Sequence, residues 1–168
     1  MTQKHISQHG TFHVTTNARG RIGWCTLPGI PEIMIDNLVM TRNIHGAQVF
    51  AFCILPDHVH MVMSPGKRGL SAFMQSFKLN SSRDVRAVFA DSRSWDSRIP
   101  ATEVKTGDIH WQNGFHDERI RDATQRSNAL TYVQYNAWRH GLIADPEGWP
   151  WSSLQFPKLI DPTEARLD

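Results

Sequence analysis

Hydrophobic residues along the chain follow two different periods, which separate strands from helices. Residues 11–16 are rich in β-branched and aromatic side chains and stop at a turn-like sequence, so they predict a first strand. Ile30, Met34 and Leu38 recur at a four-residue spacing, which predicts a helix with one buried stripe.

A hairpin and a second helix are expected next. Residues 47–55 are a nearly continuous apolar run of strand length, and a Pro-Asp turn leads into a second strand over residues 58–64. Apolar residues then follow the i, i+3, i+4, i+7 template, so a helix is expected from about Leu70 towards Phe89.

The last part of the chain is less regular. Residues 91–108 are polar and weakly patterned, which indicates a loop or an insertion. A short strand is expected around residues 115–120, and a third helix from an N-cap at Asp122 to about Arg139. The tail over residues 145–156 should fold back on the body.

The predicted order β, α, β, β, α, β, α is that of a split β-α-β sandwich. We therefore expect an α+β, ferredoxin-like fold, an antiparallel sheet with helices on one face. A length of 168 residues suits one domain, so residues 1–168 are taken as a single unit with a core over about 11–153.

Composition excludes several classes of protein. With 40% hydrophobic and 20% charged residues the chain is neither disordered nor collagenous. It has no apolar run of roughly 20 residues and no secretory signal, so we expect a cytoplasmic protein that does not enter a membrane. Cys25 and Cys53 lie far apart, which excludes a disulfide-rich scaffold and predicts two buried thiols.

The most specific local feature is the pair His58 and His60. Side chains two apart on a strand project to the same face, and two neighbouring imidazoles can bind one divalent metal. Two histidines on a strand also occur without a ligand, so both interpretations stay open at this point.

A second feature is a tyrosine on the third predicted helix. Tyr132 and Asn136 are four residues apart and should share one helix face. A lone helical tyrosine also commonly packs with its hydroxyl towards solvent, and Tyr135 suits that role. The core-facing stripe of this helix is expected to comprise Leu130, Val133 and Ala137.

Several blocks of sequence resemble a known family. Residues 55–60 (LPDHVH) and the helix that begins LSAFMQSFK resemble the HUH segment of single-tyrosine HUH transposases, whose fold is of the HUH endonuclease type. Further blocks resemble the REP-associated tyrosine transposase branch, namely WQNGFHD at 111–117, YVQYN at 132–136, HGL at 140–142 and WPWSS at 149–153. The resemblance spans about residues 12–153.

Position by position, the resemblance implies roles for four residues. His58 and His60 would bind the metal, Asn136 would complete its site, and Tyr132 would be the nucleophile. The implied product is a covalent 5′-phosphotyrosine with a free 3′-hydroxyl on the other DNA end. Phosphoryl chemistry in a half-open site favours Mg²⁺ or Mn²⁺ over Zn²⁺.

The implied partner is single-stranded or hairpin DNA, and a homodimer is possible. Two alternatives remain, a metal-dependent phosphodiesterase that activates water and a non-catalytic protein that binds hairpin DNA. The side chains expected to follow the phosphate backbone are Arg19, Arg21, Lys67, Arg68 and Lys78.

Overall fold

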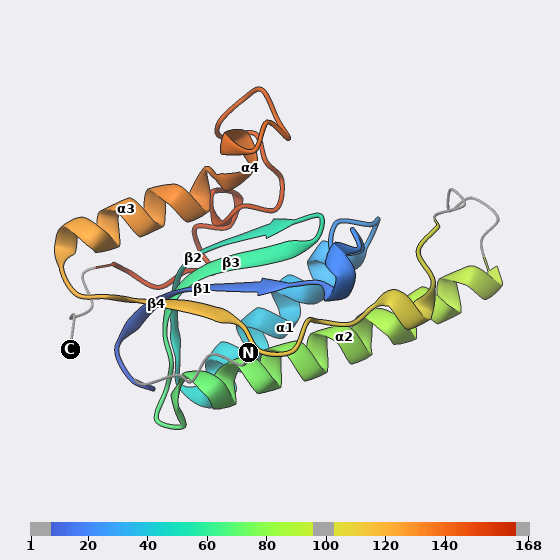
Figure 1. The fold of residues 1–168 in the computed structure, drawn as a ribbon, viewed down its shortest axis with the longest axis horizontal. Helices are drawn as coiled ribbons and strands as arrows, with labels where there is room; N and C mark the ends of the chain where they lie inside the picture. The colour runs from blue at the N-terminus through green and yellow to red at the C-terminus, as the bar shows by residue number, and fades with distance from the viewer. Residues whose placement is uncertain (1–7, 96–102, 164–168) are drawn as a thin grey trace.

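The computed structural model describes residues 8–95 and 103–163, which form an α+β fold around an open antiparallel sheet (Figure 1). The strands, in the spatial order β2-β3-β1-β4, are β1 (Thr11–Asn17), β2 (Gln48–Leu55), β3 (His58–Ser64) and β4 (His116–Ile120). The helices are α1 (Ile30–His45), α2 (Gly69–Trp95), α3 (Ala123–Gln134) and α4 (Asn136–Arg139). The expected fold class is confirmed.

Helices cover both faces of the sheet (Figure 1). α1 and α2 pack together on one face, over a core that includes Phe12, Met61 and Phe73. α3 and α4 lie on the opposite face, where Val62 and Val133 belong to a second, smaller core. The expectation of helices on one face therefore holds for α1 and α2 and is wrong for α3, because β2 and β3 bury apolar side chains on both sides.

The long helix α2 extends further than the sequence pattern indicates. It ends at Trp95 rather than near Phe89, so the expected loop begins later than residue 91. Residues 103–108 include a short 3₁₀ turn, and residues 96–102 lie outside the described part of the chain. The sequence beyond Phe89 is mostly polar, so it lacks the apolar periodicity from which a helix is predicted.

The third predicted helix is interrupted. Asp122 caps its start as expected, since its carboxylate accepts a hydrogen bond from the backbone N–H of Gln125 at 2.8 Å. Tyr135 then leaves helical geometry, with φ −103° and ψ 15°, and separates α3 from α4. The expectation of one continuous helix to Arg139 is wrong at this residue.

The C-terminal segment folds back along the edge strand β2, as expected for the tail. The indole Nε1 of Trp149 donates to the carbonyl of Ile54 at 2.8 Å, and the N–H of Ile54 donates to the carbonyl of Trp151 at 3.0 Å. Packed structure continues past residue 153, because the N–H of Asp161 bonds the carbonyl of Val49 at 2.8 Å. These bonds satisfy backbone groups that an edge strand would otherwise expose.

Both cysteines are buried thiols, as expected. In the described part of the chain, no helix is long and apolar enough to span a membrane.

We predict that Asp122→Ala lowers the free energy of unfolding by about 1 kcal/mol, because it leaves the Gln125 N–H at the start of α3 without its cap. Urea unfolding measures the loss. Asp122→Asn is the control, because its amide oxygen still caps, and a loss as large as that of alanine would contradict the capping role.

Candidate active site

The sheet carries a row of polar side chains on the face that α3 covers. Along β1, Phe12 and Val14 point into the core beneath α1 and α2, so His13 and Thr15 point to the opposite face. Antiparallel pairing of β1 with β3 sets Thr15 directly opposite His60 and Asn17 opposite His58.

His60 is held by two side chains of the neighbouring strand. Its Nδ1 lies 2.8 Å from the Thr15 hydroxyl oxygen and 3.1 Å from Nε2 of His13. His60 as a whole is only 6% exposed. Since Nδ1 is engaged, Nε2 is the ring nitrogen that remains for a ligand.

His58 is oriented by a carboxylate in the turn before it. Its Nδ1 donates to Oδ1 of Asp57 at 2.6 Å. The other carboxylate oxygen of Asp57, Oδ2, forms an ion pair with Nε of Arg21 at 2.9 Å. The imidazoles of His58 and His60 lie with ring centroids 4.9 Å apart. The Nε2 atoms of both rings are thus the free ends of two anchored side chains, an arrangement typical of metal-ligating histidines.

Burial keeps these imidazoles neutral. Burial lowers the pKa of His60 to about 2, and electrostatic interaction with the neighbouring imidazoles of His13 and His58 acts in the same direction. Burial also lowers the pKa of His58, although the Asp57 carboxylate works in the opposite direction. The contact of His58 with Asp57 at neutral pH is therefore a hydrogen bond to a carboxylate rather than an ion pair.

Tyr132 lies against this histidine cluster. Its ring centroid is 5.6 Å from that of His60 and 5.4 Å from that of His13, both edge to face, and the Arg139 guanidinium lies 5.1 Å from it. Tyr135 lies at the break between α3 and α4. The structure thus brings Tyr132, and not Tyr135, to the imidazoles.

A cavity of about 680 Å³ opens over these groups, between the sheet and α3. Its lining includes His13, His60 and Tyr132 together with the β4 side chains His116 and Glu118. The tyrosine and one imidazole of the pair, that of His60, face this space together.

Asn136 is fully buried, and neither its Oδ1 nor its Nδ2 has a hydrogen-bond partner among the described residues. The next residue, Ala137, donates its backbone N–H to the sulfur of Cys53. Cys53 lies directly opposite His60 in the pairing of β2 with β3. Asn136 therefore lies near the site, with its amide buried close to the strand position that faces His60.

The described residues contain no group of three or more His, Cys, Asp or Glu side chains that could hold a metal ion. The available donors are the two anchored imidazoles and the amide of Asn136.

The predicted DNA-contacting residues are distributed unevenly around the site. Arg19 and Arg21 follow β1 at the end of the sheet where His58 lies, and Arg21 belongs to the Asp57 network. Lys67 and Arg68 come after the far end of β3, about 20 Å from His58 at 3.3 Å per residue, so they lie away from the site.

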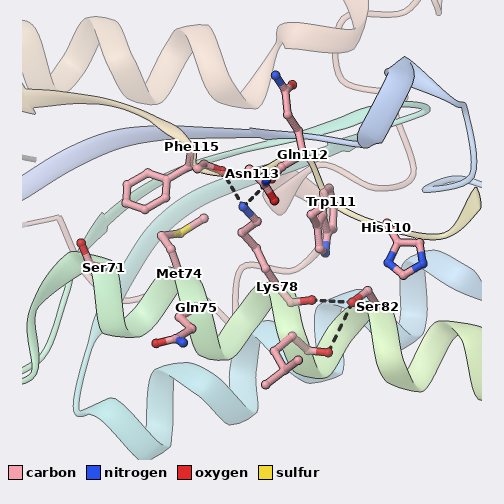
Figure 2. A pocket seen from close by; sticks show the side chains of 12 residues that line it. Ser71, Met74, Gln75, Lys78, Ser82, His110, Trp111, Gln112, Asn113 and Phe115 are labelled. Carbon is pink, nitrogen blue, oxygen red and sulfur yellow. Dashed lines mark hydrogen bonds between the residues drawn. The ribbon is translucent and has the colours of Figure 1, made fainter. Parts of the chain in front are cut away.

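Lys78 lies on α2, on the other side of the sheet from Tyr132. Its Nζ donates to the carbonyls of Gln112 and Gly114, and it lines a second cavity (Figure 2). It holds a loop rather than facing the histidines.

Sequence reasoning did not identify His13 and Thr15 as part of the site. The signal was present in the alternation of β1, where His13 lies between buried Phe12 and Val14 and Thr15 lies between buried Val14 and Thr16. Their role could not be read from that strand alone, because it depends on the pairing with β3.

Comparison with known proteins identifies the family. Residues 10–136 match the family described as Transposase IS200 like. A candidate REP-associated tyrosine transposase from Haemophilus influenzae is 28% identical over 107 residues, 64% of this chain and 58% of that protein. The match thus spans little more than half the length of this curated relative.

Two solved structures share the fold. A REP-associated tyrosine transposase bound to a REP hairpin has a TM-score of 0.68 at 17% identity, over 100% of this chain and 92% of that chain. A candidate transposase from Deinococcus radiodurans has a TM-score of 0.52 at 16% identity, over 79% of this chain and 95% of that chain. The expected resemblance to REP-associated tyrosine transposases is confirmed, and because the family match covers most of the chain, this protein belongs to the IS200-like transposase family.

Proposed function

We propose that this protein is a DNA strand transferase that cuts one strand with Tyr132. The observation that carries the proposal is the position of this tyrosine, edge to face with His60 and His13 at the wall of a 680 Å³ cavity. Tyr132 and the histidines belong to the same chain, so bringing the nucleophile to the histidines does not require a second copy of the protein.

In the proposed reaction, the phenol oxygen of Tyr132 attacks a phosphodiester. The new bond joins that oxygen to phosphorus, and the bond from phosphorus to the 3′ oxygen breaks. The phenol loses its proton and the 3′ oxygen gains one, which leaves a 5′-phosphotyrosine and a free 3′-hydroxyl. Reversal by another 3′-hydroxyl would rejoin DNA without an external energy source.

The residues around Tyr132 support this chemistry. The Arg139 guanidinium, 5.1 Å from the ring, places a permanent positive charge where a phosphate would approach the phenol. The ring contacts with His13 and His60 fix the direction of the side chain, and positioning of this kind supplies a large share of the rate in phosphoryl transfer.

We further propose that His58, His60 and Asn136 hold Mg²⁺ or Mn²⁺. The residues fit such an ion, because Nδ1 of each imidazole is anchored and Nε2 is left to ligate, and because both rings are neutral. The buried amide oxygen of Asn136, which has no hydrogen-bond partner in the described chain, is a suitable third donor. The ion would supply charge withdrawal from the nonbridging phosphate oxygens.

The proposed substrate is single-stranded DNA next to a hairpin. The support is indirect, since one structural relative is bound to a REP hairpin. We propose that the protein acts on this DNA in the cytoplasm. Whether it forms a homodimer can be determined by measuring its mass in solution.

We predict that Tyr132→Phe abolishes the protein–DNA adduct, with a loss of more than about a thousandfold, because it removes the nucleophilic oxygen. A labelled single-stranded hairpin oligonucleotide with Mn²⁺, followed by a denaturing gel, reads the adduct directly. Tyr135→Phe is the matched control and should stay within about twofold of the native protein. Continued cleavage of DNA by the Tyr132→Phe protein would indicate a hydrolase. Absence of cleavage by both the native and the Tyr132→Phe protein would indicate a protein that only binds DNA.

We predict that Thr15→Val weakens Mn²⁺ binding by about 10- to 100-fold, because His60 Nδ1 loses the hydroxyl that orients it. Mn²⁺ binding is followed by electron paramagnetic resonance of the free ion, without DNA. Thr15→Ser keeps the hydroxyl and should bind Mn²⁺ nearly as the native protein does. Equal affinity of the valine and serine proteins would remove Thr15 from the proposed site.

A further inference from the structure

A second cavity, of about 370 Å³, lies between α2 and the loop of residues 110–115 (Figure 2). It is on the side of the sheet that α1 and α2 cover, and it is separate from the cavity at Tyr132. None of the proposed catalytic groups lines it.

The charge in this cavity comes from Lys78. Two of its donors are used on the carbonyls of Gln112 and Gly114, at 2.7 and 2.5 Å, and an ammonium group has three. No acidic side chain is among the residues that line the cavity. The cavity is therefore positively charged and suits an anion that accepts the third hydrogen bond.

The walls of the cavity suit a flat, apolar ring. Figure 2 shows the Phe115 ring and Met74 on one side of the Lys78 side chain and the Trp111 indole on the other. Trp111 is fixed, since its Nε1 donates to Ser81 Oγ at 3.0 Å and its ring packs edge to face against Trp24. Phe115 is half-buried, packs against the main core and lines the cavity.

The same segment of chain borders both cavities. The loop up to Phe115 lines the Lys78 cavity, and the chain then enters β4, where His116 and Glu118 line the cavity at Tyr132. From Phe115 to Glu118 the strand advances only about 10 Å. A single polynucleotide strand that crosses the β4 edge can therefore reach both cavities.

We propose that the Lys78 cavity binds one unpaired nucleotide of the DNA strand that the protein acts on, with the base against Phe115 and a phosphate at Lys78. This inference rests on the proposed function, because it takes DNA as the substrate. An unpaired base and its phosphate match the combination of one aromatic ring and one ammonium donor, the elements that single-strand binding sites commonly combine.

The test is the affinity of the full chain for a fluorescein-labelled single-stranded oligonucleotide, measured by anisotropy in EDTA over a series of salt concentrations. Phe115→Leu keeps apolar volume and removes the aromatic face, so affinity should fall about fivefold or more. Lys78→Met should reduce the magnitude of the slope of log affinity against log salt by about 0.7, the value for one phosphate contact on a single strand. Lys158→Met, at an exposed lysine of the C-terminal segment, should change neither quantity.

Thermal unfolding separates binding from folding, because Lys78 also holds the loop of residues 112–114. If Phe115→Leu retains both the native melting temperature and the native affinity, the proposal is overturned. An unchanged salt slope in Lys78→Met protein that melts as the native chain does would overturn the phosphate contact.

Adduct formation at saturating DNA reports on Tyr132 independently of this cavity. Weaker binding by Phe115→Leu with no adduct in the native protein would support the cavity and reject the strand-transfer function. An adduct formed by the native protein, together with unchanged DNA binding by both variants, would support the strand-transfer function and reject the proposed role of the Lys78 cavity.

Discussion

Antiparallel pairing between β1 and β3 is the constraint on which the candidate site depends. It sets Thr15 opposite His60 and, on the same face, brings His13 Nε2 within 3.1 Å of that imidazole. A slip of one residue would turn these side chains to the other face of the sheet. The register is stabilised from that other face, where Phe12 and Met61 are buried under α1 and α2. The apolar core thus determines the geometry of the polar face.

Burial and anchoring act together on the histidine pair. An imidazole in an apolar environment favours its neutral form, and the neutral form is the one that offers a lone pair to a metal. The Asp57 carboxylate opposes this for His58 by favouring the charged ring, but Arg21 shares the carboxylate and moderates the effect. Arg21 adopts a left-handed φ of 57°, which is unusual for a residue other than glycine, and its side chain contacts both Asn17 and Asp57.

The sequence predicts what depends on local periodicity and misses what depends on pairing. The strands, the first two helices and the shared face of His58 and His60 follow from spacing alone. The contact of His13 with His60 joins residues 47 apart, so no local pattern contains it. The break at Tyr135 has no proline or glycine to mark it. Lys78 resembles a solvated helix lysine in sequence, and only the folded loop shows its nitrogen between two carbonyls.

The position of α3 divides the polar face of the sheet into a packed part and an open part. α3 packs against β2 and β3, where Val133 joins the second core, and it leaves the β1 and β4 positions His13 and Glu118 as the floor of the cavity. Tyr132 is adjacent to Val133 in sequence and lies at the boundary between the two parts. Packing can therefore hold the backbone of the tyrosine in place while its ring stays accessible from the cavity. The other edge of the sheet, at β2, is closed by main-chain bonds to the C-terminal segment, whereas the β4 side chains His116 and Glu118 line the cavity at Tyr132.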